Sequence, residues 1–131
     1  MALKGKDKGD QNKIHDIGFC TKSNRFATAG TKHIYFWDAD ANGLDKKKGI
    51  YNGNPMTSFS AVAFGDDGHC YTGGANSLVY KWDVEKRTCT GTIQAHKGGF
   101  ICSLKFHEGK LFSGGKDGDI HCLDVNSMSS T

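Results

Sequence analysis

The chain has 131 residues, which is enough for one domain with a substantial hydrophobic core. Apolar residues make up 37% of it, and 18 glycines against a single proline suit short strands and many turns better than helices. The net charge of +3 is mild and the lysines are scattered, so the composition gives no indication of nucleic-acid binding.

Cysteine usage and hydropathy restrict the setting further. Five cysteines occur without any Cys-x-x-Cys pair, so neither a disulfide framework nor a zinc ribbon is predicted. The first residues lack the apolar segment of a signal peptide, and no apolar run is long enough to span a bilayer. We therefore expect a cytoplasmic protein with no membrane contact and no cofactor.

The chain opens with residues 1–13, which mix lysine, aspartate and glycine and predict a solvated arm or the remnant of a preceding repeat. Three short strands are predicted next, over 14–20, 25–29 and 33–37. A fourth, outer strand is predicted to include residues 50–51. The connector between them is predicted to be a loop that carries Lys46, Lys47 and Lys48.

A second group of strands is predicted over 59–64, 69–72 and 78–82, separated by turns rich in glycine, aspartate and asparagine. The alternating polar segment 88–93 suits an outer strand with one polar face. A third group begins at residue 101 and ends near residue 124.

These groups are copies of one unit. When Phe19, Phe64 and Phe106 are aligned, a strand residue follows 18, 18 and 17 positions later, at Trp37, Trp82 and Leu123. Those three residues are 45 and 41 positions apart, which is the spacing of four-stranded propeller blades. A small sheet of this kind cannot bury its apolar faces alone, so the units are expected to stack.

The repeats resemble WD repeats, and SGGKDGDIHCLD at 113–124 follows their pattern of strand, Asp-Gly turn and strand. The stretch GTKHIYFWDADANGLDKKKG at 30–49 resembles the echinoderm microtubule-associated-protein-like (EMAP-like) proteins. The resemblance implies an all-β fold, a partial WD-repeat β-propeller with about three blades of antiparallel four-stranded sheets. The blades are expected at about 14–54, 55–95 and 96–125, followed by a polar tail over 126–131.

The resemblance also implies a buried hydrogen-bond relay in each repeat, made by a loop His, a strand Ser or Thr, a turn Asp and a strand Trp. The residues at these positions are His96, Ser113 and Asp117 in the third repeat, Thr72 and Trp82 in the second, and Thr28 and Trp37 in the first. All three relays are incomplete. Leu123 replaces the Trp, Asn76 replaces the Asp of the second repeat, and Lys32 stands near the Asp position of the first.

Three site chemistries are considered and not predicted. Residues 38–49 begin like a calcium-binding loop, but the twelfth position is Gly49 and three lysines would repel the ion. A catalytic triad is not favoured, because Ser113 lacks a nucleophile elbow. A metal site is not predicted either, because Cys89, His96, Cys102 and His107 lack ligand-pair spacing.

The stacking predicts which side chains are buried between neighbouring blades. They are Ile14, Ile17, Phe19, Phe59, Val62, Phe64, Ile101, Leu104 and Phe106. Because propellers usually have four to eight blades, we expect the ring to be closed by further blades or by other chains.

Two classes of function remain. An interaction platform would bind proteins through blade edges and loops, whereas an enzyme or lectin would need carboxylates or metal ligands converging in the central channel. The platform is the prediction. The EMAP-like resemblance implies tubulin and microtubules as partners, in the cytoplasm or in a ciliary or flagellar axoneme, with Lys46, Lys47 and Lys48 as the candidate contact. The alternative is a scaffold subunit of another protein complex.

Overall fold

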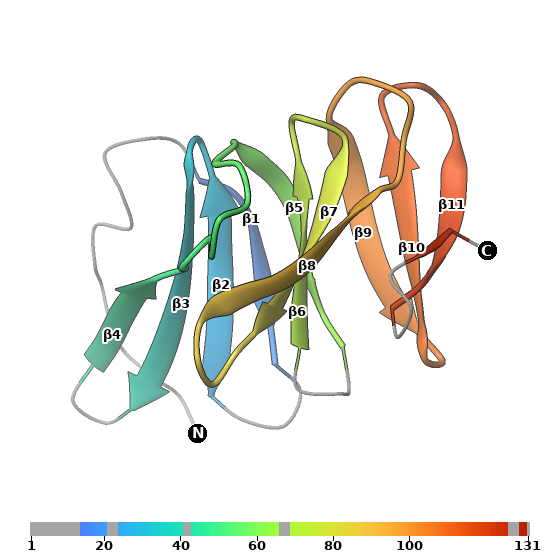
Figure 1. The fold of residues 1–131 in the computed structure, drawn as a ribbon. Coiled ribbons are helices and arrows are strands. Elements are labelled where there is room, and N and C mark those ends of the chain that lie inside the picture. Colours follow the sequence, from blue (N-terminus) through green and yellow to red (C-terminus); the bar gives the residue numbers. More distant parts are fainter. Residues whose placement is uncertain (1–13, 21–23, 41–42, 66–68, 126–128, 131) are drawn as a thin grey trace.

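The computed structural model describes residues 14–20, 24–40, 43–65, 69–125 and 129–130. These residues form twelve strands and contain no helix, and therefore none that could cross a membrane (Figure 1). The strands build three antiparallel sheets of four strands each, as the all-β prediction requires. The predicted arm and most of the predicted tail lie outside the described residues.

The first sheet contains, in spatial order, β1 (Ile14–Phe19), β2 (Arg25–Gly30), β3 (His33–Asp40) and β4 (Gly43–Lys48). The first three strands agree with the prediction to within a few residues. The prediction of the fourth strand was wrong. The strand β4 covers the segment that was expected to be a loop, and residues 50–51 lie beyond its end. The reason is that Gly43–Lys48 has little apolar surface to bury, so its sequence lacks the alternation that indicates the other strands.

The second sheet contains β5 (Phe59–Phe64), β6 (His69–Gly74), β7 (Leu78–Asp83) and β8 (Thr88–Gln94). All four strands were predicted, including the polar outer strand. The third sheet contains β9 (Ile101–His107), β10 (Lys110–Gly115), β11 (Ile120–Asp124) and the two-residue β12 (Ser129–Ser130).

The three sheets stack face to face in chain order, with the second between the first and the third (Figure 1). The innermost strands β1, β5 and β9 lie next to one another. One hydrophobic cluster joins the first sheet to the second, where Phe36 contacts Trp82, and another joins the second to the third, where Tyr71 stacks on Phe106. Phe59 and Trp82 are fully buried, and each contributes on the order of 2 kcal/mol through the hydrophobic effect.

The linker between the first two sheets is tied to the second one. Gly49 packs so closely that an added Cβ would lie 2.7 Å from Ile34 Cγ2 and 2.9 Å from Trp82 Cζ3. Beyond it, the amide of Ile50 donates to the Arg87 carbonyl at 2.7 Å, and the amide of Cys89 donates to the Ile50 carbonyl at 2.8 Å. This short parallel pairing covers the start of the open edge of β8.

Charged side chains also cross between sheets. Arg25 of β2 contacts Asp38 of β3 at 2.9 Å and Glu85, in the turn after β7, at 2.5 Å. Arg87 approaches the other oxygen of Asp38 at 3.7 Å. On the far side, the Lys81 ammonium donates to the Val125 carbonyl at 2.9 Å and so joins the second sheet to the third. Because these groups are partly exposed, they fix the orientation of the sheets more than they add stability.

The predicted burial between blades is confirmed for the second and third sheets and wrong for the first. Phe59, Val62, Ile101 and Leu104 are buried, and the two phenylalanines that close the strands, Phe64 and Phe106, are half-buried against the clusters. The first-sheet residues are exposed: Ile14 by 41%, Ile17 by 49% and Phe19 by 69%. Their counterparts in the second sheet point toward the first sheet. In the first sheet the same face has no sheet beside it among the described residues.

The opposite end of the stack also has an exposed face, on the third sheet. Ile34 and Phe36 of the first sheet point toward the second, and their repeat counterparts in the third sheet are Ile120 and Cys122. Ile120 is 81% exposed. The stack of described sheets therefore exposes a different apolar face at each end. One end exposes the face that carries Ile17 and the other the face that carries Ile120, and faces of these two kinds pack against each other inside the stack.

Two equivalent glycines give a test of this stacking. A Cβ on Gly73 would lie 2.7 Å from Ile101 Cβ, whereas a Cβ on Gly114, the same repeat position in the third sheet, would have no atom within 4 Å. Gly73→Ala should destabilise the chain by about 1–3 kcal/mol through overpacking. Gly114→Ala should change the free energy of unfolding by less than about 0.5 kcal/mol. Urea unfolding of both variants measures the difference, and equal effects would contradict the stacking.

Candidate functional site

The polar residues that join strands within a sheet lie at equivalent positions. In the second sheet, Trp82 Nε1 donates to Thr72 Oγ1 at 2.8 Å, and in the first, Trp37 Nε1 donates to Thr28 Oγ1 at 2.9 Å. Each pair spans two neighbouring strands, and all four side chains are buried. Burial leaves the indole N–H without access to water, so the threonine hydroxyl supplies its only acceptor among the described residues.

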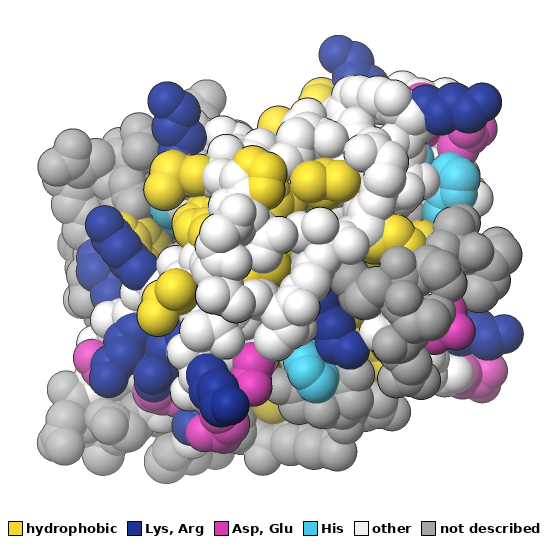
Figure 2. All heavy atoms as spheres, in the orientation of Figure 1, with side chains coloured by type: hydrophobic (Ala, Val, Ile, Leu, Met, Phe, Trp, Pro, Cys, Tyr) yellow, Lys and Arg dark blue, Asp and Glu magenta, His cyan; other side chains and the backbone are white. Residues whose placement is uncertain are grey.

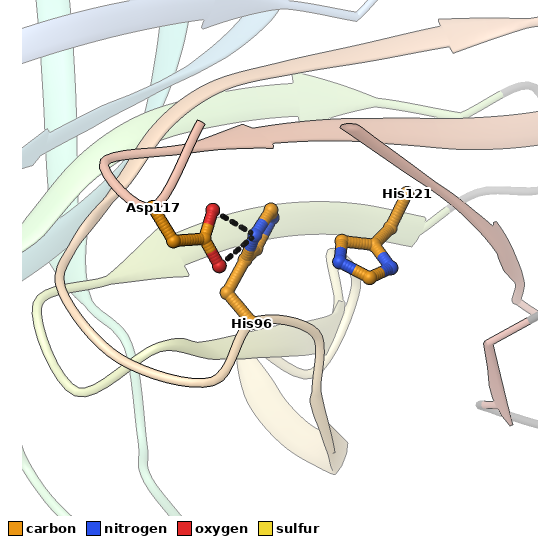
Figure 3. A group of neighbouring side chains, drawn as sticks. All are labelled: His96, Asp117 and His121. Atoms are coloured by element: carbon orange, nitrogen blue, oxygen red, sulfur yellow. Dashed lines mark hydrogen bonds and ion pairs between the residues drawn. The ribbon is translucent and has the colours of Figure 1, made fainter. Parts of the chain in front are cut away.

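In the third sheet the structure brings His96, Ser113 and Asp117 together. His96 Nε2 lies 3.0 Å from Ser113 Oγ. His96 Nδ1 lies 3.0 Å and 3.1 Å from the two carboxylate oxygens of Asp117 (Figure 3). The His96 side chain is fully buried and that of Asp117 is 19% exposed. Leu123 takes the place of the Trp and is buried, so the relay ends at the serine hydroxyl.

The turn between β10 and β11 holds the carboxylate in place. Asp117 Oδ1 accepts the amide of Asp119 at 3.0 Å. That bond, helped by His96 and by the Lys97 amide, lowers the pKa of Asp117 below its ordinary value, so the carboxylate is ionised at neutral pH. A Cβ on Gly115 would lie 2.5 Å from His96 Nδ1, which leaves glycine as the residue that fits beside the imidazole.

This geometry argues against nucleophilic catalysis by the same residues. Ser113 is 1% exposed, so its hydroxyl does not reach a surface where a substrate could bind. The equivalent hydroxyls, Thr28 and Thr72, face an indole N–H and not a base. The hydroxyl at this position acts as a hydrogen-bond partner in all three sheets.

The polar network of the second sheet has different partners. Asn76, which stands where the third repeat has Asp117, donates through Nδ2 to the Tyr80 hydroxyl at 2.9 Å. That hydroxyl donates in turn to the Pro55 carbonyl at 2.6 Å and holds the incoming linker. In the second sheet a strand tyrosine therefore bonds the sheet to the incoming linker. In the third sheet the bond between the linker residue His96 and the strand residue Ser113 makes that connection. In the first sheet, Lys32 stands near the repeat position of Asp117, and its backbone amide donates to Ser58 Oγ at 3.1 Å.

One residue near the relay was not singled out from the sequence. His121 of β11 lies beside His96, with ring centroids 4.5 Å apart and the rings perpendicular (Figure 3). It occupies the repeat position of Tyr35 and Tyr80. The signal that could have identified it is this exchange of an aromatic hydroxyl for an imidazole, two residues before Leu123.

The three lysines of the candidate partner contact do not lie in a loop, as predicted, but in the edge strand β4. Lys46 pairs with Trp37 and Lys48 with Tyr35, whereas Lys47 pairs with Phe36. Because side chains alternate along a strand, Lys46 and Lys48 point to one face of the sheet and Lys47 to the other. All three are exposed.

Lys46 is held in position by aromatic rings. Its Nζ lies 5.2 Å from the centroid of the Tyr35 ring and 5.7 Å from that of Trp37. These cation–π contacts fix its charge above the same face that exposes Ile17 and Phe19. In Figure 2, several Lys and Arg side chains gather on the side where Figure 1 draws β4.

Comparison with known proteins agrees with this architecture. The family model described as "WD domain, G-beta repeat" matches residues 87–124. The chain is 41% identical over 119 residues to "Ciliary WD repeat-containing protein ctxp80" of Euplotoides octocarinatus, covering 88% of this chain and 16% of that protein. It is 30% identical over 97 residues to "Echinoderm microtubule-associated protein-like 1" of Homo sapiens, covering 72% of this chain and 12% of that protein.

Solved propellers share the fold. The WD40 β-propeller domain of Doa1 aligns with a TM-score of 0.77 at 19% identity and covers 94% of this chain. The structure of U3-55K aligns with a TM-score of 0.79 at 17% identity and covers the whole chain. The chain spans 41% and 40% of those two structures. The expected all-β partial propeller is therefore confirmed.

The threonine–tryptophan bond gives a test of buried polar pairing. Thr72→Val keeps the shape of the side chain but leaves Trp82 Nε1 buried without its acceptor, which should destabilise the chain by about 1–3 kcal/mol. The control is Thr90→Val on β8. The Thr90 hydroxyl is exposed and donates to the Lys81 carbonyl, and water can take over that hydrogen bond, so this substitution should cost less than about 0.5 kcal/mol. Equal unfolding free energies for the two variants would contradict the role of Thr72.

Proposed function

Because this chain belongs to the WD-repeat proteins, we propose that it is a non-catalytic interaction platform, a part of a β-propeller whose edges and loops bind other proteins. The observation that supports this best is the use of its polar residues. The buried hydroxyls of Thr28, Thr72 and Ser113 are used in hydrogen bonds between strands and to the linker, which leaves them unavailable for chemistry on a substrate.

We further propose that the ring is closed by additional blades or by other chains. The two end faces differ, one carrying Ile14, Ile17 and Phe19 and the other Ile120, and they correspond to the two faces that meet between the sheets. A further blade beside each end would bury them in the same way. The chain spans 41% and 40% of the two solved propellers described above, which agrees with a ring of more blades.

The closure proposal is tested by the mass of the 131-residue chain in solution. The isolated chain should associate, because two apolar faces are left exposed. Light scattering should give a mass above 14.2 kDa, and Ile17→Ser with Ile120→Ser should reduce the association. The surface change Lys110→Ser serves as a control that leaves it unaltered. A monodisperse monomer with one cooperative melt would contradict the proposal.

Microtubules are the proposed partner, in the cytoplasm or in a cilium. The support comes from the names of the relatives, which include a ciliary WD-repeat protein and microtubule-associated protein-like proteins. The net charge of +3 and the lysine strand β4 suit an acidic protein surface. Exposed charge pairs are screened over about 10 Å at 0.1 M salt, so this binding should weaken as salt is added.

The lysines also have a simpler structural use. Charged side chains, lysine above all, keep an exposed edge strand from pairing with another sheet, and β4 is such an edge. On that reading the partner is another protein complex. A pocket of about 320 Å³ at the start of the inner strands, lined by His15, Phe59 and Phe100 among others, could accept an apolar side chain of that partner.

Charge reversal separates these two uses. In a protein that contains the closed ring, changing Lys46, Lys47 and Lys48 to Glu should lower microtubule co-sedimentation at least several-fold at low salt. The matched control reverses three other exposed lysines, Lys86, Lys105 and Lys110, and should have a smaller effect. Circular dichroism verifies that the fold is kept. If the first variant still binds as well as the control, the lysine strand is not the contact.

A further inference from the structure

We propose that His96, Asp117 and His121 form a binding site for a divalent transition-metal cation, with Zn²⁺ the best match. Each of the three residues offers one ligand atom, and these atoms all lie within 4.8 Å of one another (Figure 3). This group shares only His96 with the residues whose spacing predicted no metal site. Asp117 and His121 lie far from His96 in the sequence, and the β10–β11 hairpin brings them to the linker before β9.

The surroundings of His96 are those of a metal ligand with a supporting partner. A metal-binding imidazole usually donates its second ring N–H to a neighbouring acceptor, which fixes the tautomer. Ser113 Oγ, 3.0 Å from His96 Nε2 and 1% exposed, can accept that bond. His96 Nδ1 then carries a lone pair directed at the Asp117 carboxylate.

Two acceptors that face each other need a positive charge between them. Both carboxylate oxygens of Asp117 lie within 3.1 Å of His96 Nδ1. In one tautomer His96 carries its proton on Nδ1 and donates it to Asp117, while the Ser113 hydroxyl donates to Nε2. In the other tautomer the proton is on Nε2, and a cation can lie between Nδ1 and the Asp117 carboxylate. The position between His96 Nδ1 and the Asp117 carboxylate can therefore hold either a proton or a metal ion.

His121 distinguishes this site from the other two sheets. Tyr35 and Tyr80 occupy its repeat position, and the tyrosine hydroxyl of Tyr80 serves to hold the linker. His121 supplies an imidazole 4.5 Å from that of His96 instead. The side chain is half-buried, so it borders both the relay and the solvent from which an ion and a water ligand would come.

The donor set selects among metals. Two imidazole nitrogens and one carboxylate oxygen, with a fourth position open to water, suit Zn²⁺ and not Ca²⁺ or Mg²⁺, which prefer oxygen ligands. Tetrahedral ligand atoms about 2.0–2.1 Å from zinc are about 3.4 Å from one another. The ligand atoms of His96, Asp117 and His121, which lie within 4.8 Å, would therefore have to move about 1 Å closer together. Asp117 and His121 belong to one short hairpin and can move together. Lys116 is the nearest lysine on this turn, and its ammonium lies over the Phe100 ring at 5.4 Å.

The test is a titration of the full chain with Co²⁺, whose visible spectrum reports tetrahedral ligation and reveals thiolate ligands by their charge-transfer band. This matters because five free cysteines could bind the metal instead. One equivalent should bind without the thiolate band, and Zn²⁺ should displace it. His121→Tyr, which installs the residue of the other two repeats, should weaken binding by more than about tenfold.

Two controls accompany it. Cys122→Ser and His107→Asn, the latter at an exposed histidine of β9, should leave the affinity unchanged. In the unaltered chain, the imidazole ¹⁵N signals of His96 and His121 should both shift on addition of Zn²⁺.

Three results would overturn the proposal. They are a thiolate band in the Co²⁺ spectrum, equal affinity of the parent and the His121→Tyr variant, and histidine signals that Zn²⁺ leaves in place. The last measurement needs no substitution, so it decides the matter even where the variant fails to fold.

Discussion

The structure depends on one constraint: the apolar face of each four-stranded sheet must be covered by the next sheet. A sheet of this size is too small to bury both of its faces, and the cluster around Phe59 and Trp82 forms only because Phe36 of the preceding sheet completes it. The same constraint explains the exposed side chains. Ile17 has the chemistry of Val62, yet it lies in solvent because no described sheet stands beside it.

Stacking also determines where polar groups are tolerated. Backbone and side-chain polar atoms at a sheet interface lose water, so each must find a partner inside. Thr72 and Trp82 satisfy each other, and Tyr80 reaches the linker carbonyl of Pro55. In the third sheet His96 performs both tasks, since it enters from the linker and bonds to Ser113. Equivalent positions of the repeated sheet can therefore hold different hydrogen-bonded side chains on the same backbone arrangement.

The sequence predicted the parts of the fold that repeat and missed the parts that depend on context. Inner strands and the polar strand β8 follow from alternation, turn residues and the repeat alignment. The strand Gly43–Lys48 was missed because it forms by backbone pairing with β3 and has no apolar face to indicate it. The exposure of Phe19 was missed because a repeat pattern shows which face is apolar but not whether a neighbour covers it. The closeness of His121 to His96 results from how a linker crosses a hairpin, which residue spacing does not encode.

The edge strand β4 connects the stacking constraint to partner binding. Lys46 and Lys48 project from the face that exposes Ile17, and Lys47 projects from the face that packs toward the second sheet. A further sheet placed beside the first would therefore lie next to Lys46, whose ammonium is already held over the Tyr35 ring. Its charges and its exclusion of water would change the electrostatic potential at that ammonium. The basic surface is then a property of the closed ring and not of one segment. A partner that recognises three lysines in a row would have to bind along the strand edge, where both faces are reached at once, and this is the direction from which an acidic protein surface would meet all three charges.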